Sequence, residues 1–207
     1  MAPPSLTTTR RSLHGVAELI LAGPQYRRSA DIRLRVTEGG FATIAKPDLR
    51  LDGMHLVTGD VRVELDGRTY ADVAYAVAVD VGDPAGVYDE GSGVKPDELI
   101  TLDPEATRTI TDALLAGDVA LRGFAPEEDQ VLWPEHLDVG ITLGDVNYGV
   151  SPGDQLIPEP YAYVGPHEPR PGAFWNAPFG AAHPTRELGD AAAILRFFRA
   201  GRAHASR

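Results

Sequence analysis

Residues 131–154, VLWPEHLDVGITLGDVNYGVSPGD, hold the side chains in this sequence that are best suited to chemistry. If residues 135–143 form a strand, His136 and Asp138 share one of its faces, because successive side chains of a strand alternate between faces. A carboxylate beside a histidine can orient the ring and raise its basicity, as a general base or a metal-binding histidine requires. We therefore take His136 and Asp138 as candidate catalytic residues. The same pattern is also typical of a strand face that contacts only water.

A second group of candidates is aromatic and would bind a ligand. Tyr161 and Tyr163 alternate with alanine and valine, so both phenols project from one face of a short strand. Two such rings can stack on a sugar or another flat molecule and hydrogen-bond its rim; alternatively, they form a packed edge with their hydroxyls in water. Trp175 and Asn176 lie in FWNAPF (174–179) and could line a groove, or could belong to a small core under a loop.

Most other chemistries find no support in the sequence. It contains no cysteine, which excludes disulfides, thiolate nucleophiles and cysteine-bound metals. The motifs of nucleophile elbows, zinc-protease helices, phosphate-binding loops and dinucleotide-binding turns are absent. The segment DVNYGVSPGD (145–154) resembles the start of a calcium loop, but Leu156 stands where a bidentate glutamate is expected. We predict no metal site, and the sequence identifies no cofactor.

Composition narrows the class of protein further. The chain has 207 residues and a formal net charge of −11, which argues against nucleic acid as a partner because phosphate binding needs clustered basic residues. Charge is unevenly spread: residues 1–50 carry eight basic and four acidic side chains, whereas residues 51–207 carry 11 basic and 26 acidic ones. No apolar run reaches the length of a membrane span. We expect a cytoplasmic protein; the sequence does not indicate its oligomeric state.

The elements that must position these residues can be predicted from periodicity. Residues 1–10 read as a disordered lead, and residues 11–22 as a helix that stops at Gly23-Pro24. Alternating residues and Gly-containing turns predict an antiparallel meander over residues 31–70, whose greasy face the first helix covers. Residues 71–79 fit a short buried helix slightly better than a strand.

The second half begins with a long loop and ends with a helix. Residues 82–98, rich in Gly, Pro and acids, predict a loop that is mobile or acts as a lid. Two helices should begin at Asp caps, one at Asp103 that ends at Gly117, and one from Asp190 to about Ala200 that stops at Gly201. Between them, residues 125–190 hold 10 of the 17 prolines and both tryptophans, which indicates short strands joined by proline-fixed turns.

These elements predict an α+β fold, with an antiparallel β meander, flanking helices and a proline-rich segment of short strands. We expect one domain over residues 11–207, with a helix, meander and helix in residues 11–124. Residues 125–207 would supply proline- and aromatic-rich strands and the C-terminal helix.

The proline-rich half also carries a resemblance. The segments WPEHLDVGI, VNYGVSPGD, PEPYAYVGP and FWNAPFGAA resemble an uncharacterised family of actinobacterial hypothetical proteins, over most of the chain. The family brings no assigned activity, so the resemblance implies no site residue.

Three functions remain open. The first is a domain that binds a small polar molecule in a groove lined by aromatic and polar residues of 133–176. The second is a metal-assisted or acid–base hydrolase that uses His136 and Asp138. The third is a protein-interaction module whose acidic surface meets a basic partner. A buried histidine within hydrogen-bond reach of a carboxylate would favour the hydrolase, a pocket without that pair would favour the binding domain, and a flat apolar patch would favour the module.

Overall fold

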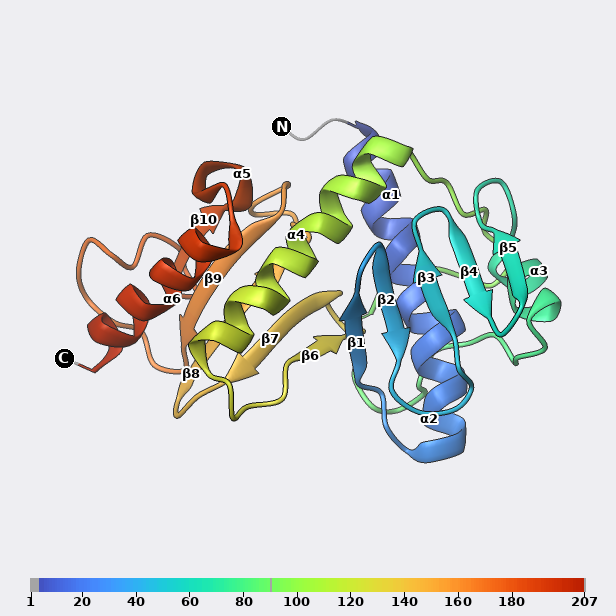
Figure 1. Ribbon diagram of the computed structural model, residues 1–207, viewed down its shortest axis with the longest axis horizontal. Coiled ribbons are helices and arrows are strands. Elements are labelled where there is room, and N and C mark those ends of the chain that lie inside the picture. Colours follow the sequence, from blue (N-terminus) through green and yellow to red (C-terminus); the bar gives the residue numbers. More distant parts are fainter. Residues whose placement is uncertain (1–3, 90, 207) are drawn as a thin grey trace.

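A single antiparallel sheet of ten strands runs through the protein (Figure 1). The computed structural model describes residues 4–89 and 91–206. Its strand order is β10-β9-β8-β7-β6-β1-β2-β3-β4-β5, so two consecutive meanders meet where β1 pairs with β6. The strands are β1 (Leu34–Thr37), β2 (Gly40–Thr43), β3 (Arg50–Asp52), β4 (His55–Thr58), β5 (Val61–Glu64), β6 (Val131–Trp133), β7 (Asp138–Thr142), β8 (Val146–Ser151), β9 (Tyr161–Pro166) and β10 (Ala181–Pro184). The predicted α+β fold with a β meander is confirmed.

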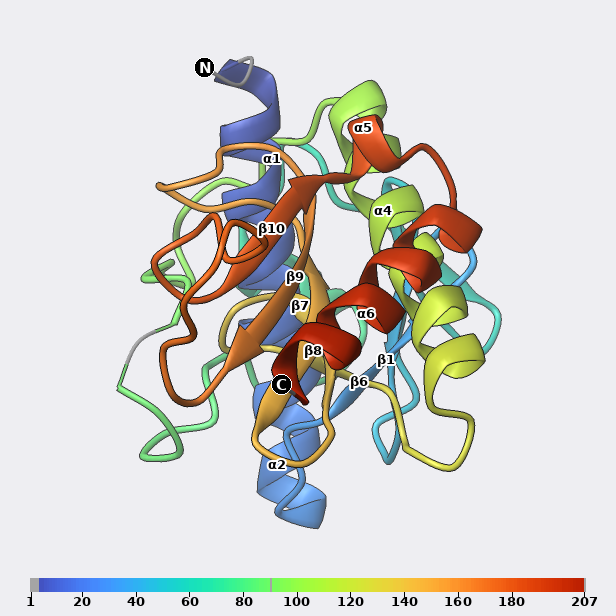
Figure 2. The same cartoon turned by 90° about the vertical axis from the view of Figure 1, so that its left-hand side faces the viewer.

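Helices pack on both faces of the sheet (Figures 1 and 2). Helices α4 (Pro104–Phe124) and α6 (Ala191–Ala205) pack on each other; α4 also packs on β7, β8, β1 and β2, and α6 packs on β9. A long rod made of α1 (Pro4–Gly15), the π-helical segment η1 (Val16–Ala22) and α2 (Gly23–Ser29) packs through η1 on β1 and β2. Figure 2 shows β7 to β9 between α1 on one side and α6 on the other. One face of these strands therefore belongs to the core, and the other faces α1.

The N-terminal rod corrects two predictions. Residues 4–10 are helical rather than a disordered lead, because Leu6 and Thr9 are buried and the Thr9 hydroxyl accepts the Asp103 amide at 2.9 Å. The rod also continues through Gly23-Pro24 to Ser29. Pro24 is the second residue of α2, directly after the π-helical segment.

Both long helices begin at the predicted caps. The Asp103 carboxylate accepts the Ala106 amide at 2.8 Å, and the Asp190 carboxylate accepts the Ala193 amide at 2.7 Å.

The predicted ends of these helices are wrong, because Gly117 and Gly201 lie inside α4 and α6. A Cβ on Gly117 would stand 2.7 Å from Val150 Cβ, and one on Gly201 would stand 2.6 Å from Val164 Cγ2. Each glycine therefore marks the point where its helix approaches the sheet most closely.

The remaining elements follow the prediction. The short helix α3 (Tyr70–Ala76) confirms a helix in residues 71–79, but it ends at Ala76 and is only partly buried, with Tyr75 88% exposed. The loop over 82–98 has no regular structure among its described residues. A short helix, α5 (Thr185–Leu188), follows β10. In the described parts of the chain, 4–89 and 91–206, no helix is both long and apolar enough to cross a membrane.

Candidate functional site

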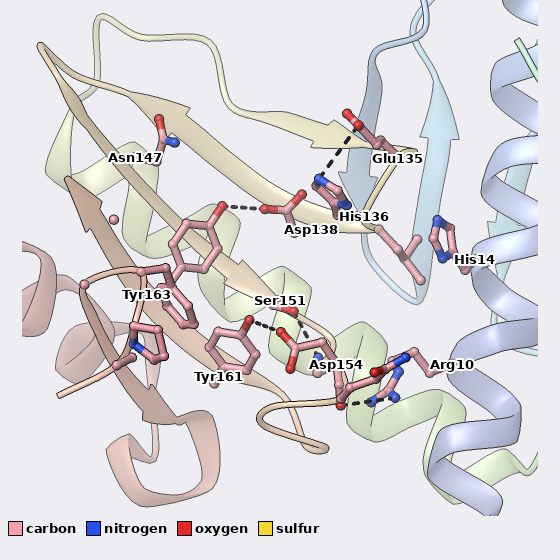
Figure 3. Close-up of a pocket in the computed structure, with 18 of the residues that line it drawn as sticks. Arg10, His14, Glu135, His136, Asp138, Asn147, Ser151, Asp154, Tyr161 and Tyr163 are labelled. Atoms are coloured by element: carbon pink, nitrogen blue, oxygen red, sulfur yellow. Dashed lines mark hydrogen bonds and ion pairs between the residues drawn. The ribbon is translucent and has the colours of Figure 1, made fainter. Parts of the chain in front are cut away.

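A pocket of about 1070 Å³ opens on the face of β7, β8 and β9 that α4 and α6 do not cover (Figure 3). Its floor comes from these strands, one wall comes from α1, and the rim comes from loops at 91–92, 153–155 and 165–180. Of the six site residues predicted from the sequence, His136, Asp138, Tyr161, Tyr163 and Trp175 line it. Segments far apart in the sequence thus meet around one cavity.

Glycines shape the floor of the pocket. Gly140, Gly149 and Tyr163 stand beside one another on β7, β8 and β9. A Cβ on Gly149 would lie 2.5 Å from the Tyr163 hydroxyl oxygen, and a Cβ on Gly140 would lie 3.1 Å from it. The Tyr163 ring can therefore lie across the two neighbouring strands because neither carries a side chain there. This brings its hydroxyl to Asp138.

Two tyrosines donate hydrogen bonds to two carboxylates along this floor (Figure 3). The Tyr163 hydroxyl donates to Asp138 Oδ2, and the Tyr161 hydroxyl donates to Asp154 Oδ2 at 2.5 Å. Burial raises the pKa of both phenols, and the neighbouring carboxylate raises each further. Both phenols are therefore held in their protonated, donating form.

Asp138 is the least satisfied polar group of the site. The residue is 9% exposed, and its Oδ1 is buried with no hydrogen-bond partner among the described residues. Burial raises the pKa of the Asp138 carboxyl, while the hydrogen bond from Tyr163 and the charge of His136 partly oppose this. A buried acceptor without a donor is rare in folded proteins and calls for an explanation, such as a bound group.

His136 does not share the strand face predicted for it. Strand β7 begins at Asp138, because Leu137 adopts a left-handed backbone conformation (φ 55°) that breaks the alternation expected over 135–143. The His136 side chain is 62% exposed, and its Nε2 lies 3.9 Å from Glu135 Oε1. No hydrogen bond joins His136 to Asp138 in the described structure, although both line the pocket.

Helix α1 contributes residues that the sequence did not identify. The Arg10 guanidinium donates to the Pro158 carbonyl at 3.2 Å and to the Asp154 carbonyl at 3.5 Å. His14 Nε2 lies 2.8 Å from the Pro134 carbonyl oxygen, and burial lowers the pKa of the His14 ring. Both side chains line the pocket. No local signal near Arg10 points to the strands more than 120 residues away, and this segment was predicted to be disordered.

The aromatic patch at 174–179 divides between the pocket and the fold. Trp175 and Phe179 line the cavity, and the Phe179 ring stacks on Tyr161 with a centroid distance of 6.1 Å. Phe174 instead stacks on His204 of α6. Asn176 does not line the pocket: its amide donates to the Ala182 carbonyl at 3.0 Å and accepts the Ala182 amide at 2.9 Å. These two hydrogen bonds attach the loop that contains Asn176 to β10.

The rim at 91–92 rests on a buried acid in η1. Glu18 is 4% exposed, and its Oε2 accepts both the Ser92 amide, at 2.9 Å, and the Ser92 hydroxyl. A Cβ on Gly91 would lie 2.0 Å from Glu18 Oε1, so only glycine permits this approach. At Ser92 the 82–98 loop is therefore hydrogen-bonded to η1.

The acids and histidines of the site do not form a metal centre. Within the described residues, no group of three or more His, Asp or Glu side chains is arranged to hold an ion. The segment compared with a calcium loop forms β8 and its turns, where the Thr142 hydroxyl donates to Asn147 Oδ1 at 2.8 Å. Calcium chemistry gains no support from this arrangement.

Hydrogen-bonding and aromatic side chains therefore line the same pocket. Comparisons with protein-family models, with curated proteins and with solved structures give no significant match to the chain. The resemblance to an actinobacterial family thus stays a prediction, and any function has to be argued from the geometry of the site.

Proposed function

We propose that this protein is a cytoplasmic domain that binds a small polar molecule in the pocket between β7–β9 and α1. The observation that carries the proposal is Asp138, a buried carboxyl on the pocket floor whose Oδ1 has no donor among the described residues. A ligand hydrogen would fill that vacant bond, and the aromatic side chains around it would supply apolar contact.

The arrangement of His136 favours binding over hydrolysis. An acid–base hydrolase would need the imidazole positioned by a carboxylate within hydrogen-bond distance. His136 instead lies 3.9 Å from Glu135 with most of its side chain in solvent, and it makes no described hydrogen bond to Asp138. A pocket that both residues line, but in which His136 and Asp138 are not hydrogen-bonded to each other, is the geometry expected of a binding domain.

The surface does not favour a protein-interaction module. Such a module would present a contiguous apolar patch with an acidic rim. The most exposed large apolar side chains among the described residues are Tyr75, Leu99, Leu156 and Val119, at 88%, 62%, 57% and 52% exposure. They come from α3, the following loop, the β8–β9 loop and α4, so they do not belong to one element.

A thermal-shift screen against a library of common metabolites tests the proposal. A ligand at 100 times its dissociation constant adds about 2.7 kcal/mol to the free energy of unfolding, which raises the melting temperature measurably. We expect the shift to fall in Thr7→Trp, because Thr7 is exposed on α1 and lines the pocket, so that an indole there takes up part of its volume.

Thr8→Trp is the matched control. Thr8 is also exposed on the same helix but does not line the pocket. A shift that is as large in Thr7→Trp as in Thr8→Trp would place the ligand elsewhere and refute the proposal, and so would a library with no stabilising member.

A further inference from the structure

We propose that the ligand is a neutral, hydroxyl-bearing ring of the monosaccharide or cyclitol type, and that one of its hydroxyls donates to Asp138 Oδ1. This inference rests on the proposed function and deepens it by naming the ligand class. Its starting point is the position of Asp138, which lines the pocket, is 9% exposed, and has one oxygen paired with Tyr163 and one buried oxygen unpaired in the described structure.

The unpaired oxygen limits what can bind there. A buried carboxylate oxygen needs an O–H or N–H donor, and a hydrocarbon or a halide offers none. A ligand hydroxyl would complete the set of bonds that Tyr163 begins. Because burial also raises the pKa of Asp138, a partner that can both donate and accept suits either protonation state of the carboxyl. A hydroxyl has both capacities, whereas an ammonium group can only donate.

The charges around the cavity favour a neutral ligand. Side chains of both signs line it, namely Arg10, Arg11 and Arg170 with Glu135, Asp138 and Asp154. A cation bound at Asp138 would share the pocket with the Arg10 guanidinium, and an anion would share it with three carboxyls. A polyol meets neither repulsion and can hydrogen-bond to groups of both kinds.

The aromatic side chains favour a ring. Tyr161, Tyr163, Trp175 and Phe179 all line the cavity, and Tyr161 and Phe179 stack with an angle of 30° between their planes. A pyranose or cyclitol presents C–H groups on the faces of its ring and hydroxyls at its edge. It can therefore touch the aromatic side chains with one surface while an edge hydroxyl reaches Asp138. The volume of about 1070 Å³ leaves room for such a molecule, since pockets for small ligands span roughly 300–1,000 Å³.

The test uses the indole of Trp175 as a reporter inside the pocket. The protein has two tryptophans, and Trp133→Phe leaves Trp175 as the single indole signal in a proton–nitrogen NMR spectrum. The probes are D-glucose, D-galactose, D-mannose and myo-inositol, with D-glucosamine and D-glucuronate as cationic and anionic counterparts. We expect a saturable shift with at least one neutral probe and a weaker affinity for the charged ones.

Two comparisons locate the hydroxyl that Asp138 accepts. Monodeoxy analogues of the binding sugar should include one whose affinity falls about tenfold or more, which is the effect of losing one hydrogen bond to a buried partner. In Asp138→Ala, which removes the acceptor, that analogue and its parent should bind almost equally. Asp145→Ala is the matched control, because Asp145 is an exposed acid in the β7–β8 turn that does not line the pocket. The deoxy series in the unaltered pocket stays informative even if Asp138→Ala folds poorly.

The outcomes separate this inference from the function on which it rests. If a charged amine, a carboxylate or an amino acid binds at the Thr7→Trp-sensitive pocket and the neutral probes do not, the ligand class is wrong and the binding function stands. If a neutral sugar binds but every deoxy analogue binds as well as its parent, the role of Asp138 is wrong. If no compound of either screen binds, both proposals fall.

Discussion

The pairing of Asp138 with Tyr163 leads to a prediction about stability. The substitution Tyr163→Phe removes only the hydroxyl group, and so leaves the buried Asp138 carboxyl without its hydrogen bond from Tyr163. A buried polar group left without a partner costs about 1–3 kcal/mol, so the free energy of unfolding should fall by about that amount. The double variant, Asp138→Leu with Tyr163→Phe, removes both the carboxyl and the hydroxyl, so no polar side-chain atom of this pair is left buried without a partner. The double variant should be at least as stable as the original protein.

Tyr161→Phe is the matched control for this prediction. Tyr161 donates to Asp154, but Asp154 is only half-buried and its Oδ1 also accepts the Leu156 and Ile157 amides, at 2.7 Å each. Water can replace the lost phenol there, so Tyr161→Phe should destabilise less than Tyr163→Phe.

The assay is equilibrium unfolding in urea, with the slope against denaturant checked for constancy among the variants. The double-variant cycle gives the coupling between the two positions directly. A double variant less stable than Tyr163→Phe alone would refute the reasoning, because it would mean that the buried Asp138 carboxyl stabilises the fold without its phenol.

Three further predictions concern the pH response and the fold. Since burial raises the pKa of Asp138, its contribution to stability is fully present below the unfolded pKa of about 3.9 and is lost as pH rises through the folded pKa. Above about pH 4 the original protein should therefore lose stability relative to Asp138→Asn as the pH rises. A difference in their free energies of unfolding that does not change with pH would contradict this. In α4, Gly117→Ala should be less stable than Gly123→Ala by about 1–3 kcal/mol in urea unfolding. Helix propensity favours alanine at both sites, but a Cβ at 117 meets Val150 at 2.7 Å, whereas one at the exposed Gly123 meets only the tip of Leu195 at 3.3 Å. Gln25→Leu should lose about 3 kcal/mol or more by the same assay, because Gln25 is fully buried and makes four hydrogen bonds to backbone groups. Gln155→Leu at an exposed site should change little.

Local patterns were enough to predict most elements of the fold. Alternation predicted β1 because Leu34 and Val36 are buried while Arg35 between them is exposed. In β2 all four residues are buried, which alternation alone does not predict. The caps at Asp103 and Asp190 were predictable because capping depends only on neighbouring residues. Gly117 has the same local signature as a helix stop, and only its contact with β8 shows otherwise.

The candidate site was predictable where it depends on strand alternation. Tyr161 and Tyr163 line the pocket while Ala162 and Val164 lie in the core, as the period of two requires. His136 was misplaced because nothing in the residue type of Leu137 signals a positive φ. The wall supplied by α1 was missed altogether, since it depends on contacts between segments at least 120 residues apart.

The π-helical turn in the N-terminal rod sets the phase between its two ends. Each residue of an α-helix advances about 100° around the axis, so a wide turn holding one extra residue offsets everything before it by that angle. Deleting a single residue within Val16–Ala22 would let the rod continue as a regular α-helix, while Gln25 would still accept a hydrogen bond from the Ile44 amide after β2. The segment before the deletion would then rotate by about 100° and carry Arg10 and His14 away from the cavity. The irregular turn is thus what directs the N-terminal side chains toward the cavity.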